Sequence, residues 1–379
     1  MLKNKIYNHF FNEIFKNFIT ILLTFAAIAW VVRAVNFLDL MVEDGYASGI
    51  YFKYSLLNIT SIITRFIPLA FLLSFTISVI KFERQKELLI LWTAGLSKIK
   101  IFHIFLLISF CIAIFQIVLS SLINPLLLNK SRSLLSNTEE LEINTVLRSN
   151  EFNDAFDGLT FYIEKKNINN ELINIFIKDE SGKFNTIIEE IGKKKNSTIF
   201  AKKGFITDDK LILYNGSVQT VNQKNEIKNV DFQKTELSLI GLSTRTIKQP
   251  KIQETSSVLL IKCIFSQNDN LNLNNCSDNY RSESIQAMSR RLAVPLYIPL
   301  ISIIISFLLI NKKEKKYTFL KKYILFSVTF IILIFAEILL KYTGLTSLIA
   351  TIYFILPILM SLLLYIYLLK EIINEKIVK

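Results

Sequence analysis

The chain has 379 residues, of which 51% are hydrophobic and 20% charged, and its mean hydropathy of +0.41 excludes an ordinary soluble protein. The formal net charge of +13 does not indicate nucleic-acid binding, because many of the lysines lie in short loops between apolar segments. Composition therefore predicts an integral membrane protein.

Six apolar runs follow one another along the chain, and each is long enough, with its flanks, to cross a hydrocarbon core of roughly 30 Å as a helix. No small-x-small cleavage site follows the first run at a convincing distance, which favours a retained anchor over a cleaved signal peptide. The predicted spans are Phe18–Val32, Phe66–Ile80, Ile99–Ile123, Leu292–Ile310, Tyr323–Leu340 and Leu345–Leu369.

Loop charges orient these spans, because short basic loops face the cytoplasm. The loop at 38–56 is acidic, with Asp39, Glu43 and Asp44, so it is expected on the opposite side. Both termini are then cytoplasmic, and the long segment after the third span is extracytoplasmic. The basic loop residues are Lys81, Arg84, Lys86, Lys98 and Lys100 after the second span, and Lys312, Lys313, Lys315, Lys316, Lys321 and Lys322 after the fourth.

Residues 126–289 have a different pattern. Apolar and polar side chains alternate with a period of two, as in Ile173, Ile175 and Ile177, which is typical of strands. Asn215–Gly216 lies between two such segments and predicts a hairpin turn. We expect an all-β insert, as a sandwich, jelly roll or open barrel, with strands at 159–164, 171–179, 198–206, 211–214, 218–221 and 229–239.

The segment Glu254–Tyr280 is polar and rich in asparagine, which predicts a connector. Cys263 and Cys276 within it allow either a loop-closing disulfide or two free thiols. The chain then divides into an N-terminal membrane domain at 1–125, the β domain at 126–289 and a C-terminal membrane domain at 290–379, with three spans in each membrane domain.

Motifs for catalysis and cofactor binding are absent from the sequence. It contains no G-x-x-x-x-G-K-[S/T] phosphate loop and no G-x-S-x-G nucleophile motif. His9 and His103 have no neighbours at metal-ligand spacing, and the paired carboxylates Glu139–Glu140 and Glu189–Glu190 lie on polar segments. No catalytic residue, metal site or cofactor is predicted.

Ionisable residues at membrane depth are costly and usually face a bundle interior, a cavity or a headgroup. One interpretation is snorkelling and ion pairing that fixes helix packing. The other is a cavity whose rim receives an anionic headgroup, because arginine binds phosphate in a bidentate fork. The candidates, all toward the extracytoplasmic side, are Arg33, Arg65, Glu337 and Lys341.

Between the second and third spans, charged residues lead into an apolar stretch that Gly95 ends. This pattern predicts a short cytoplasmic helix at about 82–97. Such a helix could lie at the interface as an anchor or insert into a groove of a cytoplasmic partner.

Several motifs resemble the lipopolysaccharide export permease family LptF/LptG, and the resemblance covers essentially the whole chain. The segments at 158–163 and 173–179 look more like LptF than LptG. The most specific motifs are VVRAVNFLD at 31–39, ELLILWTAGLS at 87–97 and RRLAVPL at 290–296.

The resemblance implies an ABC exporter in the bacterial inner membrane that takes lipopolysaccharide from the periplasmic leaflet. It implies as partners two copies of an LptB-type ATPase, the paired permease LptG (or LptF), LptC and an LptA-like periplasmic bridge. Spans one and five would line gates between the permeases, and the insert would be a periplasmic jellyroll-like domain.

The resemblance also implies residue roles. Glu87 would be the acid of a coupling helix that sits in the ATPase groove, together with Arg84, Trp92 and Gly95, and Arg33 would contact lipid A phosphates. Trp30 departs from relatives that carry a basic residue there, so the cavity charge would be lower. Arg65, Glu337 and Lys341 rest on membrane depth rather than on a matched motif.

Two other functions fit parts of the sequence. A membrane scaffold or sensor with a periplasmic binding domain would need only one or two spans, whereas six argue for a cavity or gate. A membrane enzyme acting on lipids is disfavoured, because no catalytic groups cluster at either interface.

Overall fold

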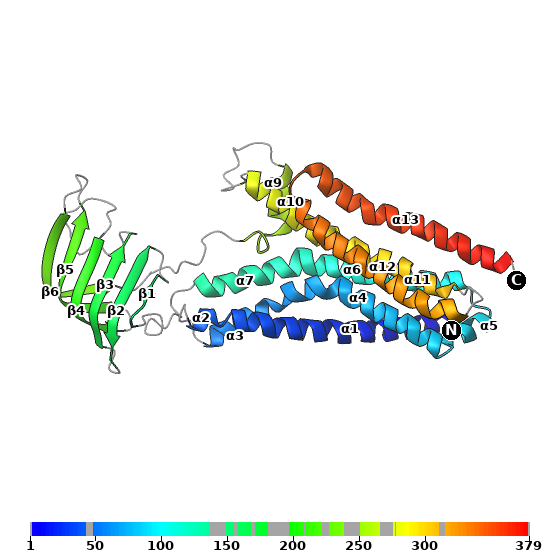
Figure 1. The fold of residues 1–379 in the computed structure, drawn as a ribbon, viewed down its shortest axis with the longest axis horizontal. Coiled ribbons are helices and arrows are strands. Elements are labelled where there is room, and N and C mark those ends of the chain that lie inside the picture. Colours follow the sequence, from blue (N-terminus) through cyan, green and yellow to red (C-terminus); the bar gives the residue numbers. More distant parts are fainter. Residues whose placement is uncertain are drawn as a thin grey trace. The chain divides into compact units, whose positions relative to one another are not determined.

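The structure is a computed structural model in which the chain forms two compact units (Figure 1). The membrane unit comprises Met1–Val31, Asn58–Asn129 and Pro250–Lys379, and the β unit comprises Val32–Leu57 and Lys130–Gln249. The described residues are 2–42, 48–136, 149–154, 158–167, 171–180, 197–207, 210–221, 227–238, 251–265, 276, 278–310 and 315–377. Glu43, Asp44, Glu139, Glu140, Glu189, Glu190, Lys312 and Lys313 lie outside them.

Helices that could cross a membrane confirm the predicted spans. Within the described residues, 6 helical segments are long and apolar enough to cross: Lys5–Met41, Ser48–Arg84, Lys98–Leu135, Asn279–Leu309, Leu320–Tyr342 and Ser347–Asn374. Their longer elements are α1 (Leu2–Asn36), α3 (Ser48–Leu57), α4 (Ile59–Arg84), α6 (Lys98–Val118), α7 (Asn124–Ser136), α10 (Asp278–Leu292), α11 (Tyr297–Ser306), α12 (Lys315–Tyr342) and α13 (Ser347–Ile377).

Shorter helical elements join or extend the spans. A π-helical turn links α6 to α7, and short 3-10 turns flank α11. These elements are α2 (Asp39–Val42), α5 (Glu87–Thr93), the π turn η1 (Leu119–Ile123), α9 (Ser257–Phe265), η4 (Val294–Leu296) and η5 (Phe307–Leu309).

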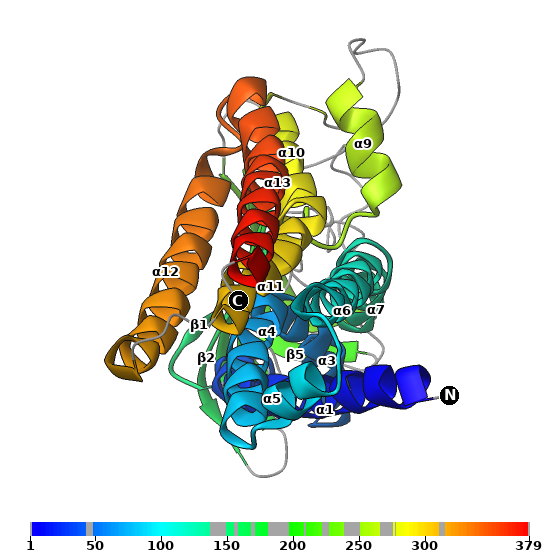
Figure 2. The same ribbon diagram turned by 90° about the vertical axis from the view of Figure 1, so that its right-hand side faces the viewer.

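Helix α11 is the centre of the membrane unit. Every residue from Tyr297 to Ser306 is buried, and the helix contacts α4, α6, α12 and α13, among which it lies in Figure 2. In contrast, α1, α12 and α13 expose long apolar faces, for example at Leu23, Phe335 and Leu348. Burial of apolar area stabilises the contacts around α11, whereas the exposed faces suit lipid or another apolar partner.

In the second and third spans, a side chain from another element donates to a carbonyl four residues before a proline. Pro68 lacks the N–H that would reach the carbonyl of Thr64, and Gln116 Nε2 donates to that carbonyl at 3.1 Å. Pro125 likewise leaves the carbonyl of Ser121 without a helical donor, and Ser257 Oγ donates to it at 2.7 Å. An unpaired carbonyl at membrane depth is costly, so these contacts fix α4 against α6 and α9 against the third span.

The Gln116 contact gives a testable prediction. Gln116→Leu leaves the carbonyl of Thr64 unpaired, and we expect it to reduce the free energy of unfolding by about 1–3 kcal/mol. Pro68→Ala restores the missing helical N–H, so the loss should be smaller in the double variant. Thermal or denaturant unfolding of the purified variants measures both. Equal losses in the two backgrounds would contradict the proposed repair.

The β unit contains the predicted sheet. It is antiparallel, and its strands pair in chain order. Leu159, Phe161, Ile175, Ile177 and further apolar residues are buried on one face. The described strands are β1 (Phe152–Asn153), β2 (Leu159–Lys166), β3 (Glu171–Asp179), β4 (Ser197–Thr207), β5 (Lys210–Val221) and β6 (Ile227–Ser238).

The predicted hairpin turn at Asn215–Gly216 is wrong, because β5 runs straight through it. Asn215 and Asn174 adopt left-handed φ angles of 52° and 51°, and both lie at the level of Lys202 on the strand between them. Across this crease the buried positions shift by one residue, from Leu172 to Ile175, so the alternation predicted from Ile173 onward holds only beyond it. Asparagine tolerates this left-handed conformation, and here it allows a kink within a continuous strand rather than a hairpin turn.

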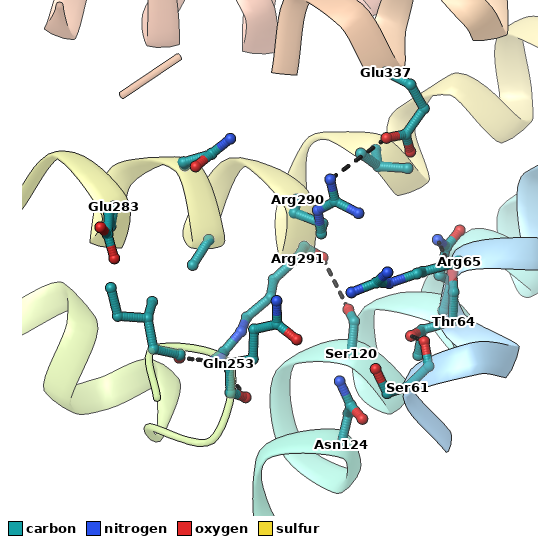
Figure 3. A pocket seen from close by; sticks show the side chains of 15 residues that line it. Ser61, Thr64, Arg65, Ser120, Asn124, Gln253, Glu283, Arg290, Arg291 and Glu337 are labelled. Atoms are coloured by element: carbon teal, nitrogen blue, oxygen red, sulfur yellow. Dashed lines mark hydrogen bonds and ion pairs between the residues drawn. The ribbon is translucent and has the colours of Figure 1, made fainter. Parts of the chain in front are cut away.

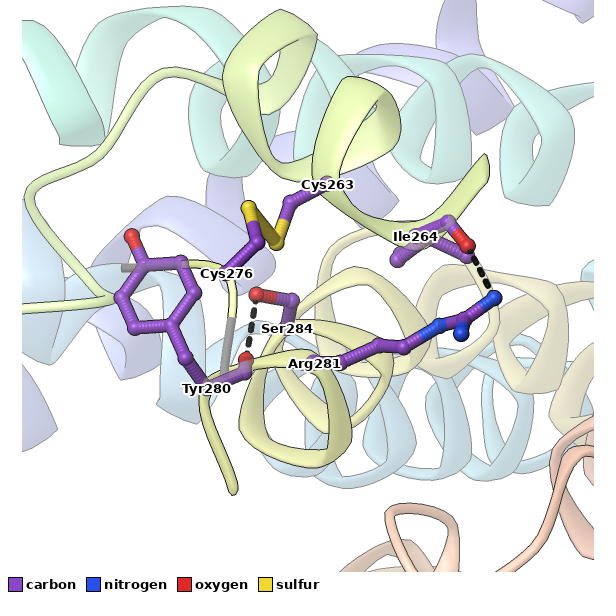
Figure 4. The surroundings of a disulfide bond; sticks show 6 residues. All are labelled: Cys263, Ile264, Cys276, Tyr280, Arg281 and Ser284. Carbon is purple, nitrogen blue, oxygen red and sulfur yellow. Dashed lines mark hydrogen bonds between the residues drawn. A yellow bond between two sulfur atoms is a disulfide. The ribbon is translucent and has the colours of Figure 1, made fainter. Parts of the chain in front are cut away.

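The segment predicted as a connector at Glu254–Tyr280 contains helix α9, which contacts α10. Cys263 and Cys276 form a disulfide with their Cα atoms 5.8 Å apart, so the bridged alternative is the one observed (Figure 4). Arg281 Nη2 also donates to the carbonyl of Ile264 at 2.8 Å. The disulfide and the arginine together hold α9 on the first turns of α10.

Candidate functional site

A polar pocket of about 360 Å³ lies at the end of the membrane unit where α4 begins (Figure 3). Helices α4, α10 and α12 and the third span contribute to it. Arg65 and Glu337, both predicted from membrane depth, line it together. The other lining residues are Ser61, Thr64, Gln116, Ser120, Asn124, Ile252, Gln253, Glu283, Gln286, Ala287, Arg290, Arg291 and Val294.

An ion pair joins two walls of the pocket. Arg290 Nη2 of α10 lies 3.5 Å from Glu337 Oε2 of α12, and the two side chains are 40% and 53% exposed. The predicted pairing of Glu337 with a basic residue is therefore present, and sequence analysis identified Arg290 only as part of a motif. Because the pair is long and exposed, it contributes little to stability, and the guanidinium can bind another anion.

Arg291 has a different environment from its neighbour. It is 6% exposed, and its guanidinium donates to Ser257 Oγ at 2.8 Å and to the carbonyls of Ile252, Gln253 and Thr255 at 3.3, 3.2 and 2.9 Å. The carbonyl of Arg291 in turn accepts a hydrogen bond of 3.0 Å from Ser120 Oγ (Figure 3). Arg291 therefore builds the wall of the pocket.

The two arginines make a matched test. Arg291→Lys cannot reproduce a planar fork that reaches several carbonyls, and we expect a loss of about 2–4 kcal/mol in the free energy of unfolding. Arg290→Lys should cost less than about 1 kcal/mol, because its side chain is exposed. Unfolding curves of both variants test this, and a larger loss for Arg290→Lys would overturn the assignment.

The remaining predicted outer residues are not among those that line the pocket. Arg33 lies in the last turn of α1, half-buried, in the part of the chain that groups with the β unit. Lys341 lies in the last turn of α12 and is exposed. Arg65 and Glu337 thus line the same pocket as Arg290, and the roles of Arg33, Arg65, Glu337 and Lys341 stay predictions.

The opposite end of the membrane unit carries α5. Its ends are fixed by left-handed residues, Lys86 with φ 59° before the helix and Gly95 with φ 85° after it. Leu96 N donates to the carbonyl of Leu91 at 3.0 Å and Gly95 N to that of Trp92 at 3.1 Å, which is a Schellman cap. The predicted helix at 82–97 is thus the end of α4, a sharp reversal and the short helix α5.

The side chains of α5 divide into a buried and an exposed set. Leu88 is buried, whereas Leu89 and Ile90 are 52% and 61% exposed. Glu87 opens the helix, and its Oε2 lies 3.1 Å from His9 Nε2. Lys98 lies over the Trp92 ring, 4.5 Å from its centroid. Arg84, the last residue of α4, is exposed.

The chemistry of both ends is that of binding. Within the described residues, no group of three or more His, Cys, Asp or Glu side chains could hold a metal ion. One end presents arginines in a polar pocket, and the other presents a short helix with exposed apolar side chains and a carboxylate.

The model of the family described as lipopolysaccharide export system permease LptF/LptG matches residues 8–371. The chain belongs to the LptF/LptG family. The match confirms the resemblance over almost the full sequence, and it covers LptF and LptG alike. LptF/LptG proteins are permeases of lipopolysaccharide export, and with its spans this chain is a multi-pass protein of the inner membrane. A search of curated proteins found no match.

Proposed function

We propose that this LptF/LptG-family chain extracts lipopolysaccharide from the periplasmic leaflet of the inner membrane as one permease of an ABC transporter. ATP hydrolysis takes place in two copies of a separate LptB-type subunit. The observation that carries the proposal is the presence of an arginine-lined pocket and a capped, exposed helix at opposite ends of one membrane unit. The choice of LptF over LptG stays a prediction.

The pocket suits the anionic part of lipopolysaccharide. Arg65 from α4 and Arg290 from α10 enter it from different helices, and Arg290 lies 3.5 Å from Glu337. Guanidinium groups bind phosphates in bidentate geometry. We assign the pocket to the periplasmic side, as the loop charges predict, and propose Arg33 and Lys341 as lipid contacts outside the pocket.

The outer helices suit lateral gates. Helices α1 and α12 expose apolar side chains along their length, among them Leu23, Val31, Ile331 and Phe335. Such faces suit acyl chains or the apolar helices of a second permease. We propose that the first and fifth spans line the two gates of a pair formed with LptG, or with LptF if this chain is LptG.

Helix α5 suits a groove in the ATPase. Leu89 and Ile90 are exposed on it, Glu87 is its first residue, and a Schellman cap fixes its C-terminus. Recognition of a short helix in a groove uses such apolar anchors together with a charged residue. This end is assigned to the cytoplasm, together with both termini.

The β unit suits delivery to a periplasmic bridge. Strands β1 and β6 are the end strands of the described sheet, and the side chains of β6 are mostly exposed. An end strand can pair with a strand of another protein. We propose that LptC and an LptA-like bridge receive the lipid from this unit.

The ATPase role of α5 is tested by copurification. Glu87→Ala should remove the bound LptB-type ATPase from the detergent-solubilised complex without unfolding the helix bundle, because the carboxylate lies at an exposed end. Glu371→Ala is a matched control, since this carboxylate lies near the end of α13 and accepts a hydrogen bond from Tyr367. ATPase binding and lipid transport that survive Glu87→Ala would refute the coupling role.

The lipid role of the pocket is tested by photocrosslinking. A photoreactive residue at Gln286, which lines the pocket, should capture lipopolysaccharide in membranes, whereas the same residue at Leu107 on the lipid-exposed face of α6 serves as control. Removing both Arg65 and Arg290 should lower the Gln286 adduct about tenfold. Labelling at Leu107 with none at Gln286 would exclude the pocket as the headgroup site.

A further inference from the structure

Polar side chains on one face of α1 form a ladder with α4 and α5. His9, Glu13 and Asn17 are spaced one helical turn apart, so they share a face. His9 Nε2 meets Glu87 Oε2 at 3.1 Å, and Asn17 Nδ2 donates to Ser78 Oγ at 2.9 Å. Between these contacts, Lys81 Nζ forms an ion pair with Glu13 Oε1. The ladder spans the end of the membrane unit that carries α5.

An aromatic cluster lies beside the ladder. Phe10 follows His9 and is fully buried, with its ring edge-on to Phe82 at 4.7 Å and to Phe105 at 5.8 Å between centroids. The His9 ring also contacts Phe82, with centroids 6.2 Å apart. Edge-on aromatic pairs favour one geometry over others. The first turns of α1 are therefore held rigidly against the end of α4.

His9 is the hydrogen-bond partner that the described part of the chain offers to Glu87. An ionised carboxylate only accepts, so His9 donates from Nε2. The side chains of His9 and Glu87 are 54% and 29% exposed, which leaves the carboxylate open to a cationic group of another protein. The contact fixes the carboxylate without covering it.

We propose that His9 is a positioning residue for Glu87, and that the ladder makes α5, the end of α4 and the first half of α1 move as one body. This inference rests on the proposed function, in which α5 receives the motion of the ATPase. Displacement of α5 would then carry α1, one of the two proposed gate helices, directly. His9 acts through Glu87 and need not touch the ATPase.

The position of the ladder along α1 supports this assignment. The apolar stripe Phe10, Ile14, Phe18, Leu22 and Ala26 packs along the length of the helix, whereas the side-chain contacts of His9, Glu13 and Asn17 with α4 and α5 lie in its first half. Apolar packing resists sliding weakly compared with directional hydrogen bonds, because dispersion has little orientation dependence. The first half of α1 is thus joined to α5 and to the end of α4 by directional contacts.

The first test measures lipopolysaccharide released per ATP hydrolysed by the whole complex in proteoliposomes. His9→Ala should lower this ratio about three- to tenfold, while the ATPase stays bound, because the loss is that of one hydrogen bond that orients Glu87. His9→Gln, which can donate to the same carboxylate, should restore most of it. His103→Ala is the matched control, since this other histidine contacts Tyr365 Oη of α13 at 3.1 Å and lies outside the ladder.

The outcomes separate the inference from the proposed function. If the wild-type chain brings no ATPase into the complex, both are overturned. If the wild-type complex couples hydrolysis to release and His9→Ala matches it, the positioning role alone is overturned. Low release by His9→Gln as well as by His9→Ala would also overturn it, because a donor at this position would then not suffice.

The second test needs no change at His9. A short photocleavable crosslinker between cysteines at Glu13→Cys and Lys81→Cys, in a Cys111→Ser background, joins α1 to α4 at the middle of the ladder and can be cleaved without a reductant, which would also break the Cys263–Cys276 disulfide. If the segments move as one body, crosslinked complexes should retain release at nearly the level of the cleaved sample. Loss of release on crosslinking that returns on photocleavage would overturn the one-body claim.

Discussion

In hydrocarbon every backbone carbonyl must have a donor within the protein, and the membrane unit depends on how this constraint is met where prolines break it. Pro68 and Pro125 free the carbonyls of Thr64 and Ser121, and the donors come from other elements, Gln116 and Ser257. These repairs bring α4, the third span and α9 together, and Arg291 secures the same region from α10. The pocket lies among these polar contacts, so the packing of the helices and the proposed lipid site share one cause.

Hydropathy and loop charge predicted the spans, because both depend on local composition. Hydropathy and loop charge could not distinguish Leu292–Ile310, which contains the buried helix α11, from Tyr323–Leu340, which lies at the surface of the helix bundle. Both runs are equally apolar. Lipid and protein interiors exclude polar side chains alike, so burial within a bundle leaves little compositional signal. The extension of the third span through α7 was missed for a related reason, because Asn124–Pro125 reads as a helix end unless a π turn and Ser257 accommodate it.

Individual residues of the pocket and of α5 could be identified from the sequence, but their side-chain partners could not. Membrane depth identified Arg65 and Glu337, but the Glu337 partner, Arg290, depends on the rotation of α10 about its axis. The sequence shows only that His9 has no neighbours at metal-ligand spacing, and nothing local links it to Glu87, which lies 78 residues away. In the β unit, Asn215–Gly216 carried a correct signal for left-handed backbone but an incorrect one for a turn, because pairing with β4 and β6 on both sides keeps the strand continuous.

Helix α4 connects the two ends of the membrane unit. Arg65 at the pocket and Lys81 at the ladder lie on it, roughly 24 Å apart at about 1.5 Å per residue. Pro68 stands near the pocket end, so the part of α4 that carries Ser78, Lys81 and Phe82 is an unbroken helix. In the proposed transporter, α4 is a stiff helix that links the lipid contact at one end to the ATPase contact near the other. Coupling between the two binding sites through this helix is reciprocal. Binding free energy that lipid gains from moving α4 must reappear as an equal change in the ATPase's affinity for α5.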